Sequence, residues 1–226
     1  MKRIFVIVVF ILILSESFGQ QKPRFFTGFF PEISLTKKLN QTQKLNFKVE
    51  NQHVWFDNRQ PEIFKFSHYR TDIMGFFDQS IRPGKSLGFG LFHRFQDGSD
   101  ANRLVQQYVY LQRFRSYSLN HRFRTDQTFT KGEALELRFR YRLSSEIALQ
   151  GEEVDVGEFY LNSSAESIFS LQDSDFEIEN RIALALGKLL DPGEKIEWGI
   201  DYRTDGYVQN GFRTRLWAKI SYYLNF

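Results

Sequence analysis

The stretch that decides the fold reads Leu135-Glu136-Leu137-Arg138-Phe139-Arg140-Tyr141-Arg142-Leu143. Its odd-numbered positions are all apolar or aromatic, and its even-numbered positions are all charged. Because successive side chains of a β-strand point to opposite faces, this alternation predicts a strand with one apolar face and one charged face. No segment of the chain shows the 3.6-residue period of an amphipathic helix.

The same alternation recurs along the rest of the chain, and residues 195–203 and 212–226 repeat it most clearly. Turn-forming sequences such as Pro83-Gly84 separate the alternating runs. The predicted strands are 24–37, 43–56, 64–77, 86–96, 102–113, 115–127, 133–148, 156–169, 176–188, 194–206 and 211–226.

Eleven predicted runs pose a problem of parity, because single-chain bacterial membrane barrels have even strand numbers. We therefore expect about twelve strands, with an extra reversal inside a long run such as 133–148. The alternative is ten strands, with the run 24–37 lying outside the wall.

The composition combines many aromatic residues with many charges. Phe, Tyr and Trp make up 17% of the chain and Asp, Glu, Lys and Arg make up 25%. Such a mixture suits strands that face lipid on one side and water on the other. The absence of cysteine excludes disulfides and thiolate metal sites. A net charge of only +3 gives no support for nucleic-acid binding.

Residues 1–19 have the order of a cleaved secretory signal peptide. Lys2 and Arg3 precede the apolar run 4–14, which is too short for a transmembrane helix of about 20 residues. Small residues then precede the expected cleavage site after Gly19. With no cysteine near this site, a lipid-anchored lipoprotein is excluded.

We expect residues 20–226 to form a single all-β domain, a transmembrane antiparallel up-and-down β-barrel in the outer membrane of a Gram-negative bacterium. The runs are longer than the 5 or 6 residues usual in soluble sheets and match the 9 to 11 that a tilted membrane strand needs. Opposite charges on the polar faces would neutralise one another in a narrow lumen. The predicted lumen charge network is Arg122, Arg124, Glu136, Arg138, Arg140, Arg142, Glu158, Glu166, Glu177, Glu179 and Arg181.

The last run ends on Phe226, with Leu224 and Tyr222 at alternate positions before it. These three residues resemble the signal that the outer-membrane barrel assembly machinery reads. The expected partners are therefore this machinery during biogenesis and outer-membrane lipids afterwards, with no nucleic acid.

Four short motifs occur in order along the chain: His121-Arg122-Phe123-Arg124, Leu137-Arg138-Phe139-Arg140-Tyr141-Arg142, the segment from Glu158-Phe159-Tyr160 to Glu166, and Asn180-Arg181. This order of motifs resembles that of an uncharacterised outer-membrane β-barrel family, domain of unknown function 2490 (DUF2490). The resemblance covers most of the mature chain, and it implies an outer-membrane barrel but no reaction.

The enzymatic alternative is a membrane-embedded lipid-modifying hydrolase, which needs a His–Ser pair on the outer wall. None of the histidines, His53, His68, His93 and His121, has a serine two residues later on the same face. A cross-strand dyad of His121 with Ser116 or Ser118 remains open.

The acidic residues at 158, 166, 177 and 179 could also be interpreted as a catalytic pair or a calcium site. Neutralisation by neighbouring arginines is the simpler interpretation. We therefore expect no catalytic residue, metal or cofactor, and a structural barrel or a narrow passive pore. A further alternative is a secreted soluble β-barrel that binds an apolar ligand.

Overall fold

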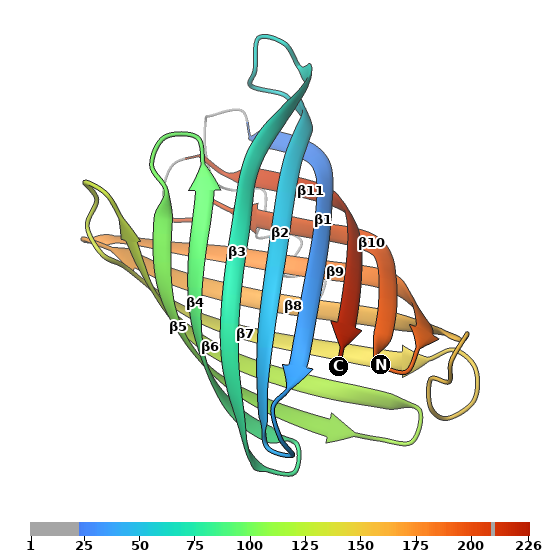
Figure 1. Ribbon diagram of the computed structural model, residues 1–226. Coiled ribbons are helices and arrows are strands. Elements are labelled where there is room, and N and C mark those ends of the chain that lie inside the picture. Colours follow the sequence, from blue (N-terminus) through green and yellow to red (C-terminus); the bar gives the residue numbers. More distant parts are fainter. Residues whose placement is uncertain (1–22, 209–210) are drawn as a thin grey trace, which may run out of the picture.

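The computed structural model describes residues 23–208 and 211–226, and in these residues eleven strands form one closed barrel (Figure 1). The signal peptide predicted over 1–19 lies outside the described residues. The strands are β1 (Arg24–Lys38), β2 (Gln43–Asp57), β3 (Phe64–Arg82), β4 (Lys85–Gln96), β5 (Ala101–Arg113), β6 (Tyr117–Thr130), β7 (Glu136–Ala148), β8 (Phe159–Gln172), β9 (Asp175–Asp191), β10 (Glu194–Asp205) and β11 (Arg213–Asn225).

The all-β barrel predicted from the alternation is confirmed, and each predicted run corresponds to one strand. Each strand pairs antiparallel with its sequence neighbours, which is the up-and-down order. No helix long and apolar enough to cross a membrane occurs among the described residues.

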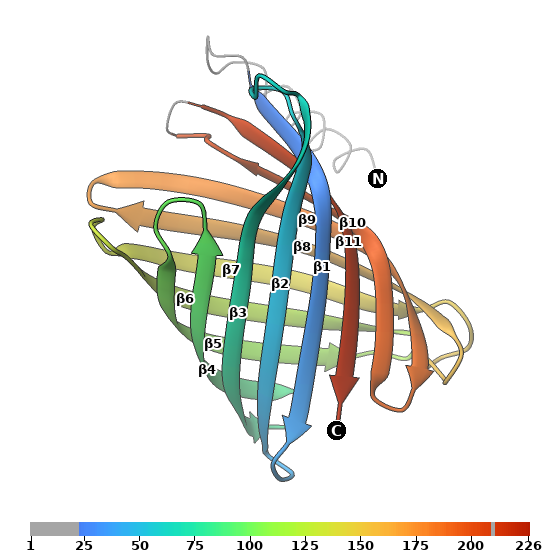
Figure 2. The same cartoon turned by 45° about the horizontal axis from the view of Figure 1, so that its top comes forward.

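The expected count of twelve strands, or ten, is wrong. The run 133–148 contains no reversal and forms β7, and the run 24–37 is part of the wall as β1. Because each strand reverses the chain direction, the first and eleventh strands point the same way. They close the barrel as a parallel pair, from Arg24 opposite Arg213 to Thr36 opposite Asn225. Figures 1 and 2 show this seam where blue β1 lies beside red β11.

The barrel has two distinguishable ends. We call the end with Arg24 and Arg213 the N-terminal end, and the end with Thr36 and Asn225 the C-terminal end. Figure 2, turned so that the top of Figure 1 comes forward, shows the C-terminus at the lower end of β11.

The alternation in β7 places charged side chains inside the barrel and apolar side chains outside. Arg140 is 8% exposed, whereas Leu137 and Phe139 are each 46% exposed. The other strands follow the same rule, so that most of the buried residues are polar or charged and many large apolar residues are exposed. This distribution is the reverse of that in a water-soluble protein.

A β-bulge in β2 changes which face its last residues present. Thr27 of β1 pairs with Phe56, whereas the next residue, Gly28, pairs with Val54, so that Trp55 is the extra residue. A one-residue shift exchanges the two faces of a strand. Asp57 is therefore buried in the lumen. The two backbones approach closely here, since a Cβ on Gly28 would lie 1.8 Å from the His53 carbonyl oxygen.

Candidate functional site

A cavity of about 410 Å³ occupies the lumen, and its lining is mostly charged. Twelve lysine or arginine side chains line it, against seven aspartate or glutamate side chains. The lining therefore carries an excess of five positive charges. The acidic members are Glu32, Glu50, Asp72, Asp78, Asp126, Glu166 and Asp201.

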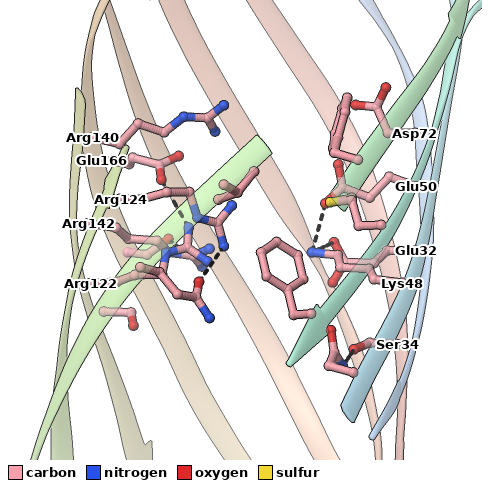
Figure 3. Close-up of a pocket in the computed structure, with 18 of the residues that line it drawn as sticks. Glu32, Ser34, Lys48, Glu50, Asp72, Arg122, Arg124, Arg140, Arg142 and Glu166 are labelled. Carbon is pink, nitrogen blue, oxygen red and sulfur yellow. Dashed lines mark hydrogen bonds and ion pairs between the residues drawn. The ribbon is translucent and has the colours of Figure 1, made fainter. Parts of the chain in front are cut away.

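Four arginines gather on one side of this cavity, with Glu166 among them, and three acidic side chains gather on the other, with Lys48 among them. Figure 3 shows Arg122, Arg124, Arg140 and Arg142 on one side, with Glu32, Glu50 and Asp72 facing them across the cavity. We call the first set the arginine wall and the second set the acidic wall. The arginine wall belongs to β6 and β7, and the acidic wall belongs to β1, β2 and β3.

The arginine wall follows directly from the alternation of two adjacent strands. In the register of β6 with β7, Arg122 lies opposite Arg142 and Arg124 lies opposite Arg140. All four side chains point inward because they share the polar parity of their strands. Like charges directly opposite one another in a sheet are destabilising, so this wall depends on neighbouring anions.

Two carboxylates supply part of that compensation. Glu166 accepts a hydrogen bond of 3.0 Å from Arg122 and lies 3.5 Å from Arg181. Asp126, which is 1% exposed, forms ion pairs with Arg140 and Arg138.

Arg124 and Arg142 have no carboxylate within ion-pair distance among the described residues. Arg124 donates to the side-chain oxygen of Gln107 at 2.8 Å, and Arg142 donates to the hydroxyl of Ser164 at 3.2 Å. The Nε atom of Arg124 is buried and has no hydrogen-bond partner. Two guanidinium groups of the arginine wall therefore have only neutral hydrogen-bond partners, although Glu166 lies opposite Arg142 in the register of β7 with β8.

The acidic wall, by contrast, is well compensated. Lys48 lies 3.0 Å from Glu32 and 2.7 Å from Glu50. Lys219 lies 2.8 Å from Glu32. The remaining member, Asp72, accepts two hydrogen bonds of 2.7 Å from Arg94.

A third group of charges lies on β9 to β11. Glu179 accepts hydrogen bonds from Arg181 at 2.8 Å and from Arg215 at 2.9 Å. Arg215 also pairs with Asp205, which is 5% exposed.

An aromatic cluster fills the lumen toward the N-terminal end, and sequence reasoning missed it. Phe26, Phe30, Val54 and Trp217 are all buried, and Tyr69 packs against them. Trp217 is fully buried, with its ring 5.8 Å from that of Phe26 and 6.4 Å from that of Phe30. The sequence did indicate this cluster, because Phe26, Phe30 and Trp217 occupy positions that the alternation assigns to the polar face.

The cavity extends instead to the C-terminal end of the barrel. Ser34, Lys44 and Asn46 line it there, close to the turn between β1 and β2. Lys44 is exposed to solvent. The aromatic cluster therefore lies at one end of the cavity, and the polar side chains of Ser34, Lys44 and Asn46 lie at the other.

The structure brings most of the predicted lumen network together but sets two members apart. Glu158 precedes β8 and accepts a hydrogen bond from the backbone N–H of Asp155. Glu177 accepts hydrogen bonds from the backbone N–H groups of Ile178 and Tyr207. The members that line the cavity are Arg122, Arg124, Arg140, Arg142, Glu166 and Arg181, and those that pair beside it are Glu136, Arg138 and Glu179.

The residues of the predicted assembly signal lie at the seam of the barrel. Tyr222 donates a hydrogen bond of 2.8 Å to Glu194 of the neighbouring strand. Leu224 lies opposite Leu35 of β1 in the parallel pair. Phe226 follows directly after β11, and its side chain is exposed.

The histidines make contacts unlike those of a catalytic base with a serine nucleophile. His121 is bonded at both ring nitrogens, to the Tyr141 hydroxyl at 2.9 Å and to the Gln112 side chain at 3.2 Å. No hydrogen bond between a histidine and a serine occurs in the described part of the chain. The described residues also contain no group of three or more His, Asp or Glu side chains arranged to hold a metal ion.

Comparison with known proteins finds a matching family model. A sequence model of the family described as "Protein of unknown function (DUF2490)" matches residues 27–211. The match runs from β1 to the residues just before β11, so it includes the arginine wall and the strands that carry it. No curated protein and no solved structure matches the chain.

Proposed function

The chain belongs to the DUF2490 family, whose function is unknown, and from its barrel we propose that it is a non-enzymatic integral protein of a Gram-negative outer membrane. One observation carries the proposal: the apolar outer wall surrounds a charged lumen. Ile182 of β9 is 60% exposed and Leu91 of β4 is 58% exposed, and these two strands lie about half the circumference of the barrel apart. Soluble monomers rarely expose apolar patches larger than a few hundred Å².

The strand lengths support a membrane location. The shortest strands, such as β4 (Lys85–Gln96), have 12 residues. At a rise of about 3.3 Å per residue such a strand is about 40 Å long. Tilted by about 45°, it spans about 28 Å, which is close to the thickness of the hydrocarbon core.

The alternative of a soluble barrel that binds an apolar ligand fits this distribution poorly. Such a protein needs an apolar lumen and a hydrated exterior. Here Asp72, Asp126 and Arg203 are at most 2% exposed inside the barrel. Phe64 and Phe66, by contrast, are the most exposed of the large apolar side chains on the outside.

The alternative of a lipid-modifying hydrolase has no observation in its favour. The hydrogen bonds of His121 to Tyr141 and Gln112 occupy both nitrogens through which it would act as a base. A non-catalytic barrel accounts for the same residues as parts of the wall.

We also propose that the lumen is blocked, so that the protein is a structural or binding barrel and not a passive pore. The aromatic cluster closes the lumen on one side of the N-terminal end. Buried ion pairs occupy the lumen around the cavity, among them Asp72 with Arg94 and Asp205 with Arg215. Each such pair would have to be broken to open a path for water.

The test is expression of the full chain in a Gram-negative host, followed by fractionation and gel electrophoresis with and without boiling. We expect the protein in the outer-membrane fraction, with the shifted mobility of a folded barrel before boiling. Intact mass should show that the chain begins at Gln20 or within a residue or two. A folded mature chain in the periplasmic fraction, soluble without detergent, would contradict the proposal.

A further inference from the structure

We propose that the arginine wall binds a small soluble oxyanion, either inorganic phosphate or a phosphorylated small solute. The site consists of Arg122, Arg124 and Arg142 inside the cavity (Figure 3). This site deepens the proposed function by giving the blocked lumen a ligand. The inference depends on the structure of the barrel and is independent of the proposed membrane location.

The first argument is charge. Arginine stays protonated in proteins, and a buried charge without a counter-charge is costly. The nearest acids are already engaged, Glu166 with Arg122 and Arg181, and Asp126 with Arg138 and Arg140. Among the described residues, the guanidinium groups of Arg124 and Arg142 therefore have no carboxylate within ion-pair distance, although Glu166 lies opposite Arg142 in the sheet.

The second argument is the arrangement of free donors. The Nε atoms of Arg122 and Arg124 are buried and have no hydrogen-bond partner. Arg122 and Arg142 face each other across adjacent strands, and Arg124 lies two residues further along the same face as Arg122. Planar guanidinium groups bind oxyanions through paired N–H donors. A tetrahedral oxyanion could accept hydrogen bonds from all three arginines at once, whereas a halide lacks the separate oxygen atoms that this arrangement fits.

The third argument is that neighbouring groups hold the arginines in place. Gln107 accepts a hydrogen bond from Arg124 and itself donates to Asp78 at 2.7 Å. The guanidinium of Arg124 also lies over the ring of Phe76, 4.9 Å from its centre. These contacts reduce the conformational freedom that binding would otherwise remove.

The fourth argument is access. The cavity of about 410 Å³ has room for a small solute and reaches the C-terminal end of the barrel, where the exposed Lys44 contributes positive charge. The acidic wall on the opposite side is a poor cation site, because Lys48 and Lys219 already neutralise Glu32. A lipid headgroup is a poor candidate, since the arginine wall points into the lumen and away from the apolar outer surface.

The experiment measures thermal unfolding of the folded barrel in a neutral detergent, with sodium phosphate or with sodium chloride at equal ionic strength. We expect phosphate to raise the unfolding temperature and chloride to have little effect, because a ligand that binds only the folded state stabilises it. Titration calorimetry with inorganic phosphate gives the affinity.

Three variants separate the site from general electrostatics. The double variant Arg124→Gln/Arg142→Gln should bind phosphate at least tenfold more weakly, since each lost charged hydrogen bond is worth about a factor of ten. Arg142→Lys keeps the charge but loses the planar pair of donors, and it should weaken binding severalfold. Lys131→Gln removes one positive charge from an exposed turn and should leave binding unchanged.

Folding of the variants is checked by the mobility shift on unboiled gels. The double variant should fold at least as stably as the wild type without phosphate, because it removes uncompensated charge. If the double variant does not fold, Arg142→Lys becomes the test of the site. Unchanged phosphate affinity in Arg142→Lys would overturn the proposal. Equal stabilisation by phosphate and chloride would also overturn it.

Two further probes identify the source of the oxyanion. Glycerol 3-phosphate should compete with inorganic phosphate, whereas micelles containing a phosphatidic acid should not. A response to the lipid alone would contradict the proposal. Because all these measurements use detergent, they succeed or fail independently of where the barrel is located in the cell.

Discussion

The main-chain N–H of Phe226 donates a hydrogen bond of 2.9 Å to the main-chain carbonyl of Thr36. The carbonyl of Phe226 in turn accepts a hydrogen bond of 2.8 Å from the N–H of Lys38. Phe226 thus joins β11 to the end of β1, at the point where the parallel seam closes the barrel. In a bilayer every such backbone group needs a partner.

Deletion of Phe226 should therefore reduce the amount of assembled barrel in the outer membrane. The deletion removes both seam hydrogen bonds and the terminal aromatic ring, whereas Phe226→Ala keeps the backbone and removes only the ring. If assembly depends on the ring, both variants should refold in detergent in vitro yet accumulate as unfolded chain in cells. Membrane fractions run on unboiled gels measure this, and normal assembly of both variants would refute the prediction.

Arginine on the outer wall should destabilise the barrel according to its depth in the bilayer. Leu184 lies midway along β9 and is exposed on the outside. Leu184→Arg should cost about 2 to 4 kcal/mol in unfolding free energy, while Leu137→Arg, close to the start of β7, should cost about 0 to 1 kcal/mol. Urea unfolding of protein refolded in lipid vesicles measures both. Equal costs at the two positions would argue against a membrane-spanning wall.

Breaking the buried pair between Arg140 and Asp126 should be costly. Arg140→Leu leaves Asp126, which is 1% exposed, with only Arg138 at 3.4 Å. We expect a loss of about 3 to 5 kcal/mol of unfolding free energy, as for other buried pairs that lose one partner. The double variant Arg140→Leu/Asp126→Leu should recover most of this loss. A double-mutant cycle by urea unfolding gives the coupling, and additive effects would show that the pair does not interact.

Two glycines that both lie within strands should respond oppositely to alanine. A Cβ on Gly187 would lie 2.1 Å from the ring of the buried Tyr160, whose hydroxyl donates to Glu197 at 2.9 Å. Gly187→Ala must displace that ring and should cost about 1 to 3 kcal/mol. A Cβ on Gly75 meets no atom within 4 Å, so Gly75→Ala should be neutral or stabilising by up to about 1 kcal/mol. Urea unfolding compares them, and equal effects would refute the packing around Tyr160.

The blocked lumen predicts no channel activity in planar bilayers. Trp217→Ala removes the centre of the aromatic cluster, and in the fraction that still folds it should produce a measurable conductance. It should also cost about 3 to 5 kcal/mol of stability. Trp198→Ala, on the exposed outer face of β10, is the matched control and should remain closed. Steady conductance of the wild-type protein would contradict the closure.

The sequence by itself determined the strands and their two faces. In β7, each of Arg138, Arg140 and Arg142 follows an apolar residue, and in a strand without a bulge the parity of a position decides which face its side chain occupies. The arginines could therefore be assigned to one face without knowledge of any contact. Parity also places Trp217 on the inner face, because it lies between Arg215 and Lys219 at alternate positions. The expectation that this face is entirely polar led sequence reasoning to overlook it.

Only the tertiary structure decided how the strands close and which charges meet. The alternation gives eleven runs, but the closure of the barrel by the parallel pair of β1 and β11 depends on an encounter between segments almost two hundred residues apart, and a two-residue period carries no information about it. In the same way, the sequence contains a similar number of acids and bases. The register places Glu166 opposite both Arg142 and Arg181, but the side chains in the closed barrel pair Glu166 with Arg122 and Arg181 and leave Arg142 hydrogen-bonded to Ser164. Direct ion pairs form only between side chains that the fold brings into contact, so the local excess of positive charge exists only once the barrel has closed.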